Sequence, residues 1–217
     1  MPVLAYCITE LEPRINVPAT GVQGSAIKSL QESGLRCFVS NYSDQASTKP
    51  VRELALTFSR VLQDMFGQIA IIPFCFPTLL SNEAELSAFV RERAAQYHED
   101  LFRLRDAVQM EVQVNFQQAD PKTGLTKQSG KDYMRARQLR HQKLDAAVQE
   151  FRRAGQTHLQ DWRQRDTATG IRGFALVPRA AVTVFLETMR RVTVPPDLNA
   201  RITGPWPATE FFEEKEK

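Results

Sequence analysis

The chain has 217 residues, of which 42% are hydrophobic and 24% are charged, and this balance is typical of a globular protein with one large or two small domains. Its formal net charge is only +3, because 28 basic residues are interspersed with 25 acidic ones, so the overall charge does not indicate nucleic-acid binding. No stretch approaches the roughly 20 apolar residues of a membrane span, and the first residues lack the pattern of a secretion signal. We therefore expect a cytoplasmic protein without membrane contact.

The three cysteines, Cys7, Cys37 and Cys75, lie in segments whose apolar pattern predicts strands. Their number is odd and none belongs to a CxxC pair, so neither a disulfide framework nor a zinc site is favoured. We interpret them as buried free thiols in a reducing compartment.

The chain opens with segments of strand character. Residues 2–8 form a short β-rich apolar run, and residues 35–39 alternate between apolar and other side chains. Gly34 stands before the second run and indicates a hairpin. Its other arm is expected at 26–31, where the spacing fits a strand or a single helical turn.

A helix is predicted next, because apolar residues recur at helical spacing from Val51 until Gly67. The run at 69–76 then indicates a buried strand, which Pro73 limits because proline cannot donate to a ladder. Strand, hairpin, helix and strand in this order resemble a ferredoxin-like unit whose first helix is reduced to a loop. We therefore expect an α+β domain at 1–78.

The clearest element of the chain is VQMEVQVNF at 108–116, which alternates strictly between apolar and polar side chains. Successive side chains of a strand point to opposite faces, so this pattern predicts a strand with one dry and one wet face, typical of an antiparallel sheet. An amphipathic helix precedes it and begins at a capping box of Asn82 and Glu85. We expect this strand in the middle of the second domain.

A long helix is predicted to start near Lys131, after a polar loop at 117–128. Gly155 can bend or break this helix. Its apolar side is expected to carry Leu144, Val148, Phe151, Leu159 and Trp162.

Three shorter elements complete the chain: strands at 174–177 and 200–203, and between them a helix at 180–192. The inward side of this helix is expected to carry Val184, Phe185, Thr188 and Val192. The second domain, 79–217, is therefore expected to be helix-rich with a small antiparallel sheet.

Basic residues concentrate in one place, since residues 131–165 contain nine Lys or Arg against four acidic residues. The plain interpretation is a solvated helix face, because no aromatic residue is interleaved as a stacking platform. The alternatives are docking to an acidic protein partner and binding to nucleic acid.

Motifs that carry chemistry are missing from the sequence. His98, His141 and His158 form no HxxxH pair, and GxSxG, GxxxxGK[ST] and GxGxxG do not occur. A GxxG at 21–24 occurs in a Pro-rich loop, where a simple turn is favoured over the backbone clamp of a KH module. We therefore expect no catalytic, metal or cofactor site, although an enzyme pocket built from distant residues would escape motif reading.

Two segments of the chain are distinctive, RITGPWP at 201–207 and IPFCFPT at 72–78. They resemble the TGPWPPY-type motif that follows a strand, and the LPFRFGT segment, of the gas vesicle accessory proteins of the GvpF/GvpL family. Its VEWGVKV-like strand corresponds to 108–114 and its SGxxYL helix start to 129–134, while 21–40 match its early glycine turn and hairpin. The resemblance covers almost the whole chain in the same order.

The resemblance implies a two-domain α+β protein without known catalytic activity, located with gas vesicles in the cytoplasm. Its implied partners are the small shell protein and other gas vesicle accessory proteins, and a basic nucleic-acid-binding module is the alternative. Trp206 has two open interpretations, packing against the core or contact with a partner, of which the first is the plainer. The candidate motif or partner-contact residues are Arg201, Thr203, Gly204, Pro205, Trp206, Pro207, Pro73, Phe76 and Tyr133.

Overall fold

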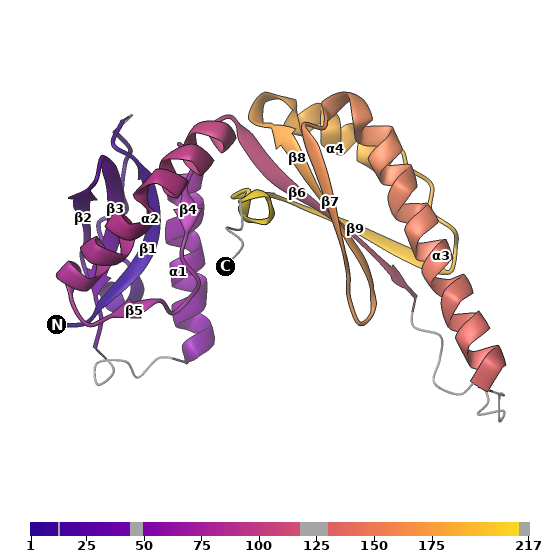
Figure 1. Ribbon diagram of the computed structural model, residues 1–217, viewed down its shortest axis with the longest axis horizontal. Helices are drawn as coiled ribbons and strands as arrows, with labels where there is room; N and C mark the ends of the chain where they lie inside the picture. The colour runs from indigo at the N-terminus through magenta and orange to yellow at the C-terminus, as the bar shows by residue number, and fades with distance from the viewer. Residues whose placement is uncertain (13, 44–49, 118–129, 213–217) are drawn as a thin grey trace. The chain divides into compact units, whose positions relative to one another are not determined.

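The computed structural model describes residues 1–217 except 13, 44–49, 118–129 and 213–217, and of residues 130–133 it describes the backbone only. The chain forms two compact units (Figure 1). Unit 1 comprises residues 1–106 together with 212–217, and unit 2 comprises residues 107–211. The predicted loop at 117–128 lies outside the described residues apart from Gln117.

Unit 1 is built on an antiparallel sheet with the strand order β2-β3-β1-β4, in which β5 also pairs with β1. This order confirms the expected ferredoxin-like topology, and the 3-10 turn Val22–Gly24 occupies the place of the first helix. The elements are β1 Val3–Glu10, β2 Ile27–Glu32, β3 Leu35–Asn41, α1 Val51–Phe66, β4 Ile72–Pro73, β5 Leu79–Leu80 and α2 Glu83–Leu104.

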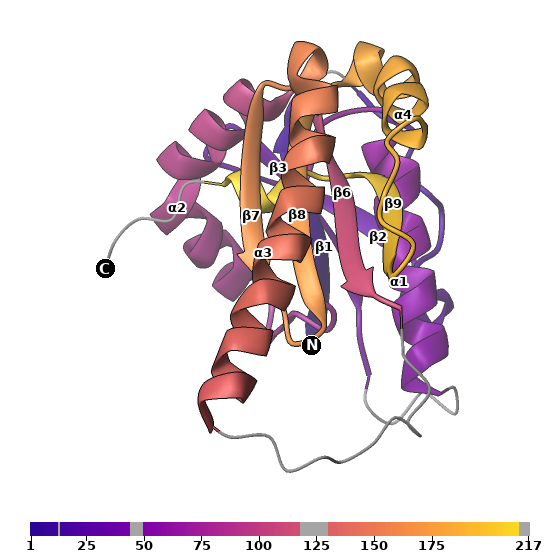
Figure 2. The same ribbon diagram turned by 90° about the vertical axis from the view of Figure 1, so that its right-hand side faces the viewer.

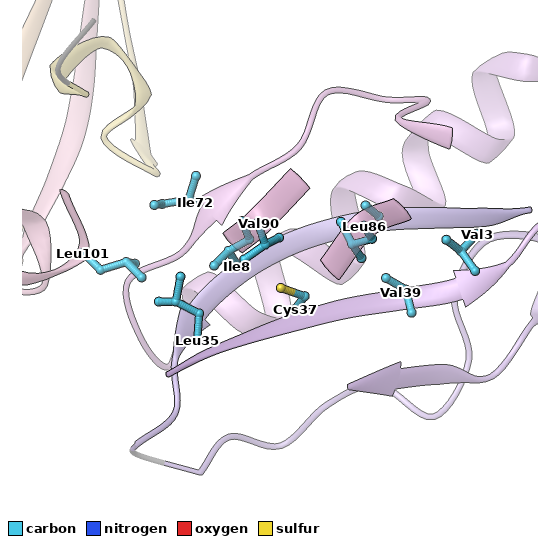
Figure 3. Packing of buried hydrophobic residues seen from close by; sticks show 10 residues of the cluster. Val3, Ile8, Leu35, Cys37, Val39, Ile72, Leu86, Val90 and Leu101 are labelled. Carbon is cyan, nitrogen blue, oxygen red and sulfur yellow. The ribbon is translucent and has the colours of Figure 1, made fainter. Parts of the chain in front are cut away.

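The two faces of this sheet are covered by different helices. On one face, Phe58 of α1 stacks on Tyr6 with ring centroids 5.1 Å apart, and the Cys7 thiol lies 3.4 Å from the sulfur of Met65. The other face packs against α2 in a core cluster (Figure 3). This cluster contains Val3, Ala5, Ile8, Leu35, Cys37, Val39, Ile72, Leu86, Val90 and Leu101, with Phe212 packed against it.

The division of the chain differs from the one expected at residue 78. The compact units divide between Asp106 and Ala107, so α2 belongs to unit 1. The physical reason lies in β1, whose residues Val3–Ile8 are all buried because they are apolar on both faces. A strand that is buried on both sides needs a layer on each face, and α1 supplies only one of them.

The Tyr6 hydroxyl fixes the turn that replaces the first helix. It accepts the backbone N–H of Val22 at 2.8 Å and lies 3.0 Å from the hydroxyl of Ser40. Burial raises the pKa of Tyr6 above its ordinary value. A Cβ at Gly21 would lie only 2.1 Å from the Tyr6 hydroxyl, so this position requires glycine. The GxxG segment is thus the simple turn that the sequence favoured.

The predicted capping box of α2 is confirmed, whereas of the strand predicted at 69–76 only Ile72–Pro73 form β4. Asn82 Oδ1 accepts the N–H of Glu85 at 2.9 Å, and Glu85 in return accepts the N–H of Ser81 at 2.6 Å. Strand β4 ends at Pro73, as the missing proline donor requires. Cys75 therefore lies outside any strand and is exposed, which corrects its expected burial.

We expect only Cys75 to react with a thiol reagent in the native protein. Cys7 and Cys37 are buried, and burial is the main cause that raises the pKa of both, that of Cys37 to about 12. Their thiols stay protonated and unreactive at neutral pH. Native protein should therefore titrate one thiol, Cys75→Ser none, and denatured protein three. A reactive thiol in native Cys75→Ser would contradict the buried placement of the other two.

Unit 2 contains a second antiparallel sheet with the order β7-β8-β6-β9, so the VQMEVQVNF strand is central, as expected. Strands β8 and β9 are both longer than their patterns predicted. The elements are β6 Ala107–Phe116, α3 Gly130–Gly155, β7 Asp161–Asp166, β8 Gly170–Pro178, α4 Val182–Arg190 and β9 Leu198–Trp206, with 3-10 turns at Gln156–His158, Arg179–Ala181 and Thr209–Phe211.

One face of this sheet is apolar and lies under α3 and α4 (Figure 2). Val108, Met110, Val112 and Val114 of β6 are fully buried there, while Glu111 and Gln113 on the opposite face stay partly exposed. The buried residues of this core include Val108, Met110, Val112, Val114, Leu144, Val148, Phe151, Phe185 and Met189. Among the described residues, no helix is long and apolar enough to cross a membrane.

Two helix predictions need correction. Helix α3 ends at Gly155, where a Cβ would lie 2.9 Å from side-chain atoms of Phe185 and Met189, and Trp162 lies on β7 instead. Leu159 and Trp162 continue the helical spacing of apolar residues in the sequence, but both lie beyond the end of α3. In α4, Phe185 is inward as predicted, but Val184 is 49% exposed and Met189 is the second buried residue.

Candidate interaction surfaces

The C-terminal motif lies on β9, an edge strand of unit 2 that pairs with β6. The register shifts between Gln109 and Glu111, so that Gly204 and Pro205 form a bulge. Gly204 has φ +120°, and a Cβ there would lie 2.9 Å from the carbonyl oxygen of Gln109. Only glycine fits this bulge, which sets the position of Trp206 opposite Gln109.

Trp206 is 38% exposed, so its expected placement against the core is wrong. Its partner Gln109 belongs to the polar face of β6, away from α3 and α4, and directly opposed strand residues share a face. The indole Nε1 is 3.5 Å from the Thr203 hydroxyl. Arg201 and Pro205 are exposed on the same strand. The motif therefore presents a large aromatic side chain to solvent.

The turn after Trp206 is anchored on the polar face of the sheet. The backbone N–H of Glu210 donates to the buried Gln109 side chain at 3.0 Å, and Glu210 forms an ion pair with Arg165 at 2.7 Å. Phe211 is fully buried beneath the guanidinium of Arg163. Fixed contacts after Trp206 and the bulge before it hold this tryptophan in place.

A second surface is a groove beside the N-terminal half of α3, with a volume of about 620 Å³. We call it the α3 groove. Its walls are α3, the end of β6 and the turn between β7 and β8. The lining residues are Phe116, Ala136, Arg137, Arg140, His141, Leu144 and Asp166–Gly170.

The α3 groove carries an excess of positive charge. The Arg140 guanidinium lies 4.3 Å from the ring centroid of Phe116, and His141 Nε2 is 3.0 Å from a carboxylate oxygen of Asp166. Arg137 has no ion-pair partner among the described residues. Lys143, outside the groove, binds both oxygens of Asp197 and lowers the pKa of that carboxyl.

The predicted candidate residues are divided between the two units. Arg201–Pro207 belong to unit 2, whereas Pro73 and Phe76 belong to unit 1. The ring centroids of Phe76 and Phe58 are 5.2 Å apart. Tyr133 is part of α3, but its side chain lies outside the described atoms. The described residues include no group of three potential metal ligands, and His98 Nε2 is hydrogen-bonded to the carbonyl of Ser33 at 2.8 Å.

The basic concentration is evident from the sequence, but the groove is not. A signal was available, since Arg137, Arg140, His141 and Leu144 follow the helical spacing of one face that continues into the core. The depth of the groove depends on Phe116 and Asp166–Gly170, which are distant in sequence.

These features define an α+β protein with two antiparallel sheets and two exposed surfaces. The gas vesicle synthesis protein GvpL/GvpF family matches residues 2–213, and the chain belongs to this family. No curated protein sequence matches it. The crystal structure of the gas vesicle protein GvpF from Anabaena sp. PCC7120 is similar, with a TM-score of 0.79 and 14% identity over 99% of this chain and 97% of that one. The crystal structure of the gas vesicle protein GvpF from Microcystis aeruginosa is also similar, with a TM-score of 0.76 and 14% sequence identity. The match covers 97% of this chain and 98% of that one.

Proposed function

We propose that this protein is a non-catalytic gas vesicle assembly factor that acts in the cytoplasm by binding the small shell protein and other gas vesicle proteins. Family membership supports the gas vesicle role. The observation that carries the binding role is the exposure of Trp206 on an edge strand. Its motif is the part of the chain that most resembles the family's C-terminal signature.

Trp206 has the physical properties of a binding anchor. A tryptophan offers a large apolar area, and the side chains that dominate protein interfaces are enriched in tryptophan. Pro205 and Pro207 stiffen the backbone on either side, so little further conformational freedom is lost when the indole docks. A rigid, exposed aromatic side chain favours binding of an apolar protein surface over turnover of a substrate.

We expect the purified protein to retain the small shell protein in a pull-down at both low and high salt. Burial of apolar area depends weakly on ionic strength, whereas contacts with phosphates release counterions and weaken by orders of magnitude as salt rises. The measurement is the retained shell protein at two salt concentrations, with a labelled DNA duplex as the parallel ligand.

Loss of the retained shell protein at high salt would contradict an apolar contact. Tight, salt-sensitive binding of the duplex without retention of the shell protein would favour the nucleic-acid alternative. A bait of the same charge that is unrelated in sequence serves as the control for unspecific adsorption.

A further inference from the structure

The side of α3 that faces the core changes its chemistry along the helix. In the C-terminal half, Leu144, Val148 and Phe151 are buried against the sheet. The same side continues toward the N-terminus, at spacings of three and four residues, as His141, Arg140 and Arg137. A helix face that is core at its C-terminal end therefore carries two arginines and a histidine at its N-terminal end.

The N-terminal end of α3 extends beyond the ends of the strands (Figures 1 and 2). All side chains from Met134 to Lys143 are exposed, although the α3 groove lies directly beneath some of them. The groove is within the size range of sites that enclose several side chains of a ligand. Leu144 and Ala136 contribute apolar side chains to its lining.

The charges of the groove favour an anionic occupant. Among the described residues, Arg137 has no ion-pair partner, and Arg140 contacts the ring of Phe116 but no carboxylate. A guanidinium can bind a carboxylate through two parallel hydrogen bonds. The guanidinium of Arg137 makes no such pair with a described residue, so it can bind a carboxylate of a ligand.

We propose that the α3 groove docks an acidic segment of a partner protein. Carboxylates of this segment pair with Arg137 and Arg140, and an apolar side chain between them rests on Leu144. The inference deepens the proposed function, on whose partner binding it rests, and adds a second contact surface with its own chemistry to the apolar contact at Trp206.

The groove suits a protein segment better than nucleic acid. Phe116 is covered by Arg140, so its face is not free to stack on a base. Asp166 adds a carboxylate to the lining, which can accept N–H groups of a peptide backbone. Two guanidiniums in one groove match a few carboxylates rather than the continuous charge of a nucleic-acid backbone.

Binding of a fluorescein-labelled acidic peptide with the repeat Glu-Glu-Leu to the full chain tests the proposal by fluorescence anisotropy. We expect R137E/R140E to weaken the affinity about tenfold or more, because the like charges repel the peptide. The matched control is R135E/R152E, which changes the net charge equally on the same helix but outside the groove. Its affinity should stay within about threefold of the parent.

Several outcomes would overturn the proposal. These are absence of peptide binding by the parent, undiminished binding by R137E/R140E, and equal weakening in the control, which would show unspecific attraction. Stronger competition by an oligothymidylate than by unlabelled peptide would assign the groove to nucleic acid. Far-UV circular dichroism verifies that both variants are folded. The proposed function is tested separately by the pull-down. If it is wrong, the parent protein retains no gas vesicle protein, even if it binds the acidic peptide.

Discussion

Replacing Trp206 with Ala is expected to weaken retention of the small shell protein by about thirtyfold or more, the effect of truncating an interface anchor worth about 2 kcal/mol. The folded protein should survive this change. Trp206 is 38% exposed on an edge strand, so the variant should lose about 1 kcal/mol of unfolding free energy, well below the roughly 3–5 kcal/mol of a buried tryptophan. Pull-down and chemical denaturation of the same preparation measure both quantities.

Trp162 offers a matched control in the same unit. Its indole lies over Gly173, where a Cβ would come within 2.2 Å of the ring. Trp162→Ala should therefore lower the stability of unit 2 and leave the retention of shell protein per folded molecule unchanged. If Trp206→Ala retains the shell protein like the parent, the proposed contact at this residue is wrong. If it unfolds as easily as Trp162→Ala, its role is structural.

Replacing Tyr6 with Ala is expected to cost about 3–5 kcal/mol of unfolding free energy, because a fully buried aromatic ring is lost and leaves a cavity beside Phe58. Tyr6→Phe keeps the ring but removes the acceptor of the buried Val22 N–H, and should cost about 1–3 kcal/mol. Tyr42→Phe, at a half-buried position, is the control that should change little.

The position of the tryptophans makes this experiment informative about both units. The chain has 2 tryptophans, and Trp162 and Trp206 both belong to unit 2. Fluorescence therefore reports the unfolding of unit 2, while far-UV circular dichroism reports both units. Tyr6→Ala should therefore shift the circular dichroism transition to which unit 1 contributes. A common shift of both signals would mean that the units unfold together.

Most elements of the fold were predictable because their residues carry the pattern themselves. The alternation at 108–116 and the capping box before α2 depend on neighbours in sequence, and both are confirmed. Strand β7, DWRQRD, contains one apolar residue and was missed. Its extended form depends on pairing with β8, a partner that its own sequence does not reveal.

The candidate surfaces were predictable only in part. The C-terminal motif located the right segment, but the exposure of Trp206 follows from the bulge at Gly204, which shifts the register of an entire strand end. The place of α2 in unit 1 has a related reason. The need for a second layer follows from the burial of β1 on both faces, and a helix that supplies it can come from anywhere in the chain.

The packing of Phe212 affects the order in which the protein can be completed during translation. Phe212 follows directly on the last residue of unit 2, yet it packs against the core of unit 1. Unit 2 is thus inserted into unit 1. During translation, Phe212 is therefore added to the chain only after all of unit 2 has been synthesised. A nascent chain stalled within unit 2 exposes the apolar surface that Phe212 later covers, and such a surface is where chaperones bind.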